Sequence, residues 1–306
     1  MTSTSIPTFP KFRKLSIDDA PHIRRFSNRF QPYSLFNFSC LWEWNTEQKC
    51  KISKLNGNLV IFYTDFITSK PFVTFLGTNK ASETATEIFK FLEKKKMPQS
   101  LLFVTEETKN CLPHPDFHIE EDRDNFDYIF STSKLALSLG VDFKQKRQLV
   151  HKFTREYPDA RFVQENIDNL TVRKNLTAVI RRWEKNKIDN SKKYSLEHEK
   201  KAINRLLKDD KNRKLILSCV YVGKTMIGFS IDEILSSGFA MAHFIKADYS
   251  FKGIGEFINE KVAQHLLEKG VELWNWQQDL NYDGLRRLKM SYHPVHFLKT
   301  YTISKK

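Results

Sequence analysis

The sequence has few cysteines, glycines and prolines, and no long apolar run. Only 10 glycines and 10 prolines occur among 306 residues, whereas 25 phenylalanines, 10 tyrosines and 5 tryptophans supply ample aromatic surface. This composition excludes a collagen-like or low-complexity chain and argues against disorder. A chain of this length buries roughly three quarters of its unfolded surface, and an allowance of about 150 residues per domain predicts two domains. We therefore expect a globular protein with a substantial core.

The apolar runs are too short to cross a membrane. The longest, such as residues 215–222, reach about eight residues, well short of the roughly 20 that a transmembrane helix needs. The N-terminal residues lack the apolar core and small-residue cleavage site of a secretory signal, so we expect a cytosolic, cytoplasmic protein. No Cys-x-x-Cys pair occurs among the cysteines, which are Cys40, Cys50, Cys111 and Cys219. Buried thiols are therefore expected rather than disulfides or zinc ligands.

Positive charge is in excess. The chain carries 50 Lys and Arg against 36 Asp and Glu, a net charge of +14. A surface of this sign favours nucleic acid, an anionic lipid surface or a phosphorylated cofactor, and it equally serves solubility alone. Local basic groups occur at residues 94–96, 144–147, 181–187 and 200–214, so the charge does not form a single basic tail.

The order of expected elements repeats along the chain. Each half has paired strands, then an amphipathic helix, then a buried strand. In the first half these fall at residues 59–65, 71–77, 83–96 and 100–105; in the second they fall at 215–222, 225–234, 239–247, 256–268 and 271–276. Further helices are expected at residues 134–157, 172–186 and 196–207. We infer a mixed α/β chain of two tandem units with a boundary near residues 130–140.

The densest group of polar side chains follows the last buried strand. Its members, including those on the expected helix 282–290, are Asn275, Gln277, Gln278, Asp279, Arg286 and Lys289. Amides and a carboxylate at a strand end suit a ligand that carries an ammonium group, and the two cations suit a phosphate or a developing oxyanion. The alternative is a helix N-cap at Asp279 or Asp283 followed by a solvated basic face.

Two further places carry candidate residues. Lys252, Gly253 and Gly255 lie between a strand and a helix, where backbone N–H groups can meet a phosphate because the glycines permit close approach; a plain tight turn is the alternative. His243 lies within an apolar strand and is either a binding residue or general base, or a satisfied core histidine. His293 and His296 have no further His or Cys at ligand spacing, so we expect no metal site.

The long string over residues 275–299, from Asn275-Trp-Gln-Gln-Asp279 through Ser291-Tyr-His-Pro294, resembles the signature of the phosphatidylglycerol lysyltransferase C-terminal domain family. Residues 33–45 and 146–153 look like that family's other marked segments, so the resemblance spans almost the whole chain. The chain departs from the family in two places: Gln277 stands where Glu is usual, and Asn281 stands where Gly is usual. The first departure removes a carboxylate that would serve as a general base or favour a dibasic aminoacyl group.

The resemblance implies two tandem acyltransferase domains of the GNAT kind, which agrees with the repeated element order. We expect them at residues 1–133 and 134–306. The first is expected to be non-catalytic because residues 105–110, its counterpart of the polar cluster, lack the aromatic and basic continuation. The positions that the resemblance marks as probable pocket residues are Asn275, Gln278, Asp279, Arg286, Lys289, Tyr292 and His293. Among these, Asp279 with the two amides would hold an ammonium group or the acceptor, the cations would contact phosphate, and Tyr292 or His293 would be the general base.

Family members with assigned activity move an aminoacyl group from aminoacyl-tRNA to a lipid head group. The resemblance therefore implies a soluble acyltransferase with aminoacyl-tRNA as co-substrate, an amine or hydroxyl acceptor, contact with tRNA and anionic membrane, and no tightly bound cofactor. An acyl-CoA-dependent GNAT enzyme is the first alternative, with residues 252–255 cradling the pyrophosphate; Ser250 opposes it, because Arg or Gln is usual there. A non-catalytic protein that binds RNA or anionic membrane is the second.

Overall fold

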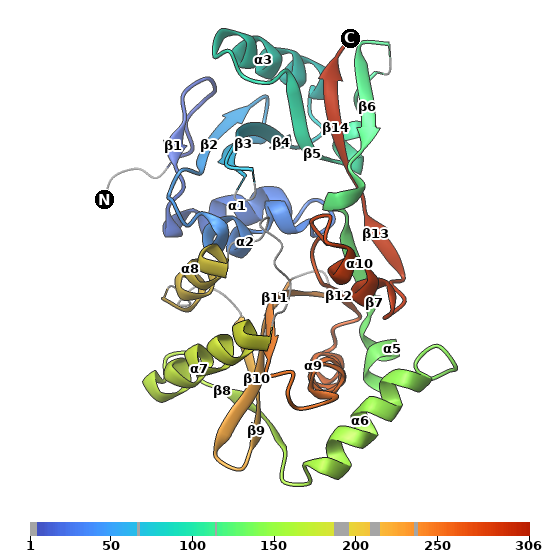
Figure 1. The fold of residues 1–306 in the computed structure, drawn as a ribbon. Coiled ribbons are helices and arrows are strands. Elements are labelled where there is room, and N and C mark those ends of the chain that lie inside the picture. Colours follow the sequence, from blue (N-terminus) through green and yellow to red (C-terminus); the bar gives the residue numbers. More distant parts are fainter. Residues whose placement is uncertain (1–4, 66–67, 114, 187–195, 209–214, 236–237) are drawn as a thin grey trace.

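The computed structural model describes residues 5–306 except 66–67, 114, 187–195, 209–214 and 236–237. It is a mixed α/β structure, as predicted, with three sheets and helices packed on their faces. The N-terminal half and most of the C-terminal half lie one above the other in Figure 1. Among the described helices, none combines the length and apolar character that crossing a bilayer requires.

The first half is built on an antiparallel sheet with helices on both faces. Its strands, in spatial order, are β1 (Arg13–Lys14), β2 (Lys51–Leu55), β3 (Asn58–Thr64) and β4 (Pro71–Leu76). Alternation along β3 sends Leu59 and Ile61 toward α1 (Ala20–Ser27) and α2 (Phe38–Trp44), and Val60 toward α3 (Ala81–Lys94). Short 3-10 helices occur at η1 (Ile17–Asp19), η2 (Ser34–Phe36) and η3 (Arg123–Asn125).

A seven-stranded sheet forms the second half. Its spatial order is β13 (His296–Leu298), β7 (Asp127–Ser131), β12 (Leu273–Asn275), β11 (Phe239–Ala247), β10 (Thr225–Ile234), β9 (Leu215–Val222) and β8 (Arg161–Glu165). Among the described strands of this sheet, β11 and β12 pair in parallel and the other neighbours pair antiparallel. One face packs on α7 (Leu170–Asn186) and α8 (Leu196–Lys208), and the other on α5 (Thr132–Leu137), α6 (Lys144–Glu156) and α9 (Ile254–Glu268). The helix α10 (Asp283–Met290) follows β12.

The two halves exchange strands. β14 (Thr300–Lys305), at the C-terminus, lies between β5 (Ser100–Thr105) and β6 (Phe117–Glu121) of the first half, where Figure 1 shows the red strand beside green ones; the short helix α4 (Glu106–Lys109) follows β5. Conversely, β7 lies between β12 and β13. The predicted ranges 1–133 and 134–306 therefore each lend a strand to the other's sheet.

Two local predictions were wrong. The expected continuous helix at 134–157 is two helices, because Ser138 and Gly140 adopt left-handed backbone angles (φ 47° and 88°) that end α5 and open a loop before α6. Cys111 is exposed at the end of the turn after α4, whereas the other three thiols are free and buried as expected. An apolar neighbour in sequence is not enough to bury a side chain in a surface turn.

Candidate active site

The polar cluster begins where two parallel strands separate. β11 and β12 pair from Phe239 with Leu273 to Met241 with Asn275, where β12 ends; β11 continues to Ala247, and the chain that follows β12 no longer pairs with it. At this point Gln277 donates a hydrogen bond of 2.6 Å from Nε2 to the backbone carbonyl of Ala242. A glutamate in this position would set an acceptor against an acceptor, so the departure from the family pattern has a structural consequence.

The backbone of this segment is unusual. Gln277, Leu280, Asn281 and His293 all have positive φ, between 54° and 59°. Side chains at such angles cost free energy, and positions of this kind concentrate at functional sites. Asn281 tolerates the conformation better than most residues, which explains how Asn replaces the usual Gly there.

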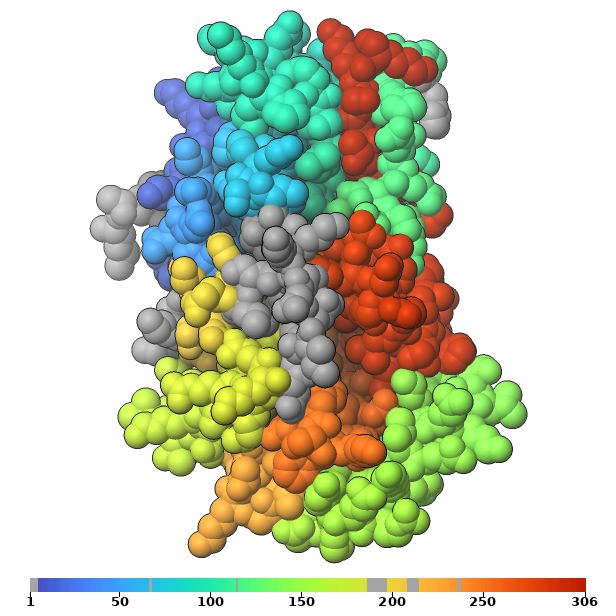
Figure 2. Space-filling view, in the orientation of Figure 1, coloured from blue at the N-terminus to red at the C-terminus, as the bar shows by residue number. Residues whose placement is uncertain are grey.

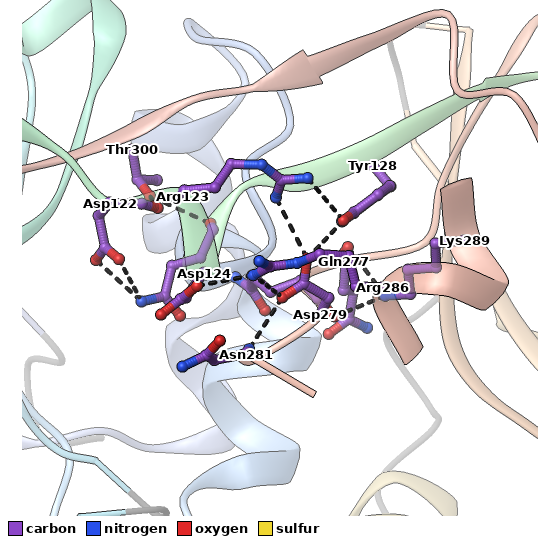
Figure 3. Close-up of polar contacts among 12 residues, drawn as sticks. Asp122, Arg123, Asp124, Tyr128, Gln277, Asp279, Asn281, Arg286, Lys289 and Thr300 are labelled. Carbon is purple, nitrogen blue, oxygen red and sulfur yellow. Dashed lines mark hydrogen bonds and ion pairs between the residues drawn. The ribbon is translucent and has the colours of Figure 1, made fainter. Parts of the chain in front are cut away.

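The carboxylate of Asp279 is fully buried and surrounded by donors. Arg286 donates to it from Nε and Nη2, both at 2.9 Å, and the hydroxyl of Tyr128 donates at 2.5 Å. Arg123 adds a contact of 3.3 Å, and these side chains converge on Asp279 in Figure 3. Burial acts to raise the pKa of Asp279, but the hydrogen bonds from Arg286 and Tyr128 outweigh it and lower the pKa below its usual value. Its oxygens thus bind η3, β7 and α10 together.

The neighbouring amides point toward the first half. Asn275 donates to the carbonyl of Pro32 at 2.9 Å and to Asp127 at 3.1 Å, and Gln278 donates to Ser34 at 2.7 Å. Ser34 in turn donates to Asp127 from both its backbone N–H and its hydroxyl. This buried network fixes the segment against η2.

The two predicted phosphate-contacting cations are engaged with the protein itself. Lys289 is buried and donates to the backbone carbonyls of three successive residues, 276 to 278, at 2.6, 3.1 and 2.6 Å. Burial lowers the pKa of Lys289 to about 7, while the nearby carboxylates act in the opposite direction. Arg286 spans Asp279 and Asp124. Both cations hold the loop between β12 and α10 in its strained shape.

Tyr292 lies in a different environment, between α6 and α9. Lys146 places Nζ 4.0 Å from the centre of the Tyr292 ring and 3.7 Å from Glu256, and Asn259 interacts with the Tyr292 hydroxyl. Burial raises the pKa of Tyr292, so the phenol is protonated at neutral pH, and burial lowers the pKa of Lys146. The nearby Asn259 Oδ1 and the Nε1 of Trp276 are buried without a hydrogen-bond partner among the described residues.

This group brings the buried phenol of Tyr292, the cation of Lys146 and unsatisfied polar atoms together beside Trp276. Unsatisfied buried polar atoms are costly, and they mark places where a ligand can supply the missing partner. His293, the next residue, is exposed, and its ring centre lies 5.7 Å from that of Phe143. The sequence pattern did not point to Lys146, Glu256 or Asn259. For Lys146 alone, the resemblance of residues 146–153 to a family segment was an available signal.

The glycine loop before α9 is tightly packed. Gly253 has φ 86°, and a Cβ there would lie 2.4 Å from the backbone carbonyl of Leu149 in α6. A Cβ at Gly255 would lie 3.3 Å from the ring of Tyr249, and Lys252 is exposed. The packing of α6 against this turn accounts for the first glycine without a phosphate.

His243 belongs to a separate buried cluster at the boundary of the halves. Its ring nitrogens lie 3.1 Å from Glu43 and 3.4 Å from Glu233, and Arg24 pairs with Glu233 at 3.1 Å. Burial acts to lower the pKa of His243, but the charge of Glu43 and further contacts raise it well above its usual value. Cys40, Glu43 and His243 also bring potential metal-ligand atoms within 4.8 Å of one another, a grouping that sequence spacing did not indicate.

The predicted residues thus occupy three places rather than one. The segment 275–293 and the glycine loop flank α9, whereas His243 contacts α2. A surface depression lies elsewhere again, lined by residues 44–47, 49–50, 63–65, 69 and 198, and includes none of the predicted site residues.

The mixed sheets with helices on their faces, and the parallel pair β11 and β12 that separates at a polar cluster, define a GNAT-like fold. This is the fold of a class of acyltransferases. The predicted fold class is confirmed. The chain matches the family model described as phosphatidylglycerol lysyltransferase, C-terminal, over residues 27–304, and it belongs to that family.

Solved structures share the fold of this chain. A conserved protein of unknown function from Bacteroides thetaiotaomicron is 23% identical with a TM-score of 0.83, covering 96% of this chain and 99% of that one. The C-terminal domain of a putative lysylphosphatidylglycerol synthetase from Agrobacterium fabrum is 11% identical with a TM-score of 0.66, covering 95% and 91%. L-PGS from Bacillus licheniformis is 13% identical with a TM-score of 0.64, covering 99% and 94%. No curated protein matches the sequence.

Proposed function

We propose that this protein transfers an aminoacyl group from aminoacyl-tRNA to the hydroxyl of a lipid head group, with the reaction at Tyr292. The observation that carries the proposal is the group of Tyr292, Lys146 and Glu256. The ring of Tyr292 lies 5.1 Å from that of Trp276, the residue that directly follows β12. Family membership supports an acyltransferase, and one structural relative is named as a domain of a putative lysylphosphatidylglycerol synthetase.

In this proposal the acceptor hydroxyl attacks the ester carbonyl carbon of the donor, and the ester bond to the terminal ribose breaks. The departing ribose oxygen needs a proton. Tyr292 suits a proton donor better than a base, because burial raises its pKa and keeps the phenol protonated. His293 is exposed beside it and is the candidate to accept the proton of the attacking hydroxyl. The excess of positive charge would attract the tRNA backbone.

The acyl-CoA alternative has less support from the glycine loop. The carbonyl of Leu149 packs directly over Gly253, and Ser250 is held by Asp248, to which it donates at 2.6 Å. An acidic side chain in this loop opposes a pyrophosphate, although Arg182 pairs with it at 3.0 Å. The sequence departure at Ser250 points the same way.

The proposal is tested by ligand-induced stabilisation and by single-turnover transfer. A ligand at about a hundredfold excess over its dissociation constant stabilises by roughly 2.7 kcal/mol. We expect a raised melting midpoint with a non-hydrolysable aminoacyl-tRNA analogue and no change with acyl-CoA. The reverse result would favour the acyl-CoA reaction, and stabilisation by uncharged RNA without transfer would favour a binding protein.

Tyr292→Phe separates catalysis from binding. We expect it to lower the transfer rate by about 10²-fold to 10⁴-fold, the usual contribution of a general acid, while the analogue still stabilises the protein. Tyr157→Phe is the matched control, since Tyr157 also packs against the same core between α6 and α9. Equal rates for wild type and Tyr292→Phe would remove Tyr292 from the mechanism.

A further inference from the structure

Three aliphatic side chains project from the loop that joins α5 and α6. Leu137, Leu139 and Val141 are 57%, 68% and 86% exposed, and Val141 is the most exposed of the large hydrophobic side chains that the structure describes. Single exposed apolar side chains are common on protein surfaces. Three at alternate positions within five residues form a concentrated apolar tip, and such a tip marks an interaction site.

The loop is built to hold this shape. Arg147 in α6 donates from Nη1 to the carbonyls of Ser138 and Gly140, the latter at 2.8 Å. The Ser138 hydroxyl donates to the carbonyl of Leu135 at 3.0 Å, and Phe143 anchors the end of the loop in the core. The apolar side chains are therefore presented to solvent by a braced loop, so little conformational entropy is lost when a partner covers them.

Positive charge surrounds the apolar tip. Lys134, in α5 three residues before the loop, and Lys144, at the start of α6, are both exposed, and Asp142 is the one acidic residue between them. Helix α6 continues with further basic side chains, which are Lys146, Arg147, Lys152 and Arg155. Apolar side chains at a tip with cations behind them match the interface of an anionic bilayer, where the former enter the acyl boundary and the latter meet the head groups.

The same elements reach the candidate active site. Phe143, at the end of the loop, contacts His293, and Lys146, less than one turn further along α6, lies over Tyr292. Figure 2 shows the light-green segment that contains this loop and α6 as a projection at the lower right of the molecule. A membrane contact made by this projection would lie beside the proposed reaction centre.

We propose that residues 137–143 form a membrane-docking loop that inserts Leu137, Leu139 and Val141 into an anionic lipid surface. The assignment of lipid as the acceptor rests on the proposed function, but docking itself does not require transfer. RNA fits the loop less well, because its phosphates would engage the lysines and leave the aliphatic side chains in water, and the loop offers no outward aromatic ring for stacking bases.

Vesicle flotation tests the proposal with the full chain. The probes are vesicles of phosphatidylcholine alone and of phosphatidylcholine mixed with phosphatidylglycerol. We expect binding only to the anionic vesicles, weakening as salt is raised. The double variant Leu139→Ser, Val141→Ser should bind them at least about tenfold more weakly, because two large apolar side chains no longer enter the bilayer. The double variant Lys134→Gln, Lys144→Gln should also bind the anionic vesicles more weakly, and its binding should depend less steeply on salt than that of wild type.

The matched control is Leu170→Ser, which removes a leucine that is 73% exposed at the start of α7. It should bind vesicles as wild type does, and all variants should melt at the wild-type midpoint because the altered side chains are on the surface. Wild-type vesicle binding by the double loop variant would overturn the proposal. So would an equal loss of RNA binding, which would identify the loop as a nucleic-acid surface.

Transfer assays keep the two proposals apart. If docking is the role of the loop, the double loop variant should lose transfer to vesicle lipid yet keep wild-type transfer to a short-chain lipid dispersed in detergent. Absence of transfer to either acceptor by wild type, with vesicle binding intact, would contradict the proposed function and leave docking standing.

Discussion

The stability of an Asp279→Ala variant shows whether Asp279 has a structural role or a ligand-binding role. The side chain is fully buried and accepts hydrogen bonds from Arg286, Tyr128 and Arg123. Its removal leaves two guanidinium groups and a buried phenol without their common acceptor. We therefore expect the free protein to lose stability before any ligand is added.

The magnitude follows from the exposure of the partners. Breaking a fully buried ion pair costs about 3–5 kcal/mol. Arg286 and Arg123 are 30% and 37% exposed, so water recovers part of the loss, and Arg286 retains Asp124. We expect a loss of about 2–3 kcal/mol in the free energy of unfolding. With an unfolding entropy of about 0.64 kcal/mol/K for 306 residues, the midpoint should fall by about 3–5 °C.

The assay is thermal and urea unfolding of wild type, Asp279→Ala and the control Asp283→Ala. Asp283 is exposed in the first turn of α10, so its loss should cost only about 0.3–1 kcal/mol. Because the pKa of Asp279 is lowered in the folded protein, the wild-type advantage is present above the ordinary carboxyl pKa near 3.9 and is lost as pH falls through the lower folded value. An unchanged or raised midpoint for Asp279→Ala without ligand would refute the reasoning and favour an ammonium-binding role.

Three other predictions concern single side chains. Gly253→Ala should destabilise by about 2–4 kcal/mol, because the new Cβ meets the Leu149 carbonyl and φ is positive. Gly284→Ala, with open space around it inside α10, should instead stabilise by up to about 1 kcal/mol. Equal effects of the two substitutions on urea unfolding would contradict the packing argument. Lys289→Met should cost about 3 kcal/mol, since the buried carbonyl of Trp276 and the partly buried carbonyls of Gln277 and Gln278 lose their donor. An unchanged midpoint would disprove this role. The stability that His243 contributes should be fully present below about pH 6.5 and be lost as pH rises through the raised pKa of the folded protein. The difference in free energy of unfolding between wild type and His243→Gln should therefore shrink at alkaline pH. A difference that stays constant with pH would exclude a charged His243.

The local sequence determined the elements and the family. Several strands have the predicted bounds, because their apolar residues and the turn at Gly223 restrict where a strand can begin and end. They are the strands at 100–105, 215–222, 225–234 and 239–247. The helices predicted at 172–186 and 196–207 are present within a few residues. The long string at 275–299 carried enough specific residues to indicate the family, and the repeated element order indicated two units.

Tertiary structure decided how those elements combine. A strand of six residues carries no local mark of the sheet it will join, so the exchange of β7 and β14 between the halves followed only from long-range pairing. The same holds for His243, which lies about two hundred positions from Cys40 and Glu43 in sequence and is brought beside them at the boundary of the halves.

The chemistry of the site shows the same division. The sequence determined that Asp279 follows a buried strand and that Arg286 and Lys289 lie on the next helix. It did not determine whether these side chains face a ligand or one another. Arg123 and Tyr128 reach Asp279 from about 150 residues away, and backbone carbonyls surround Lys289. Whether a charged side chain is free or paired depends on desolvation and on partners brought by the fold, and these are properties of the packed chain rather than of any segment.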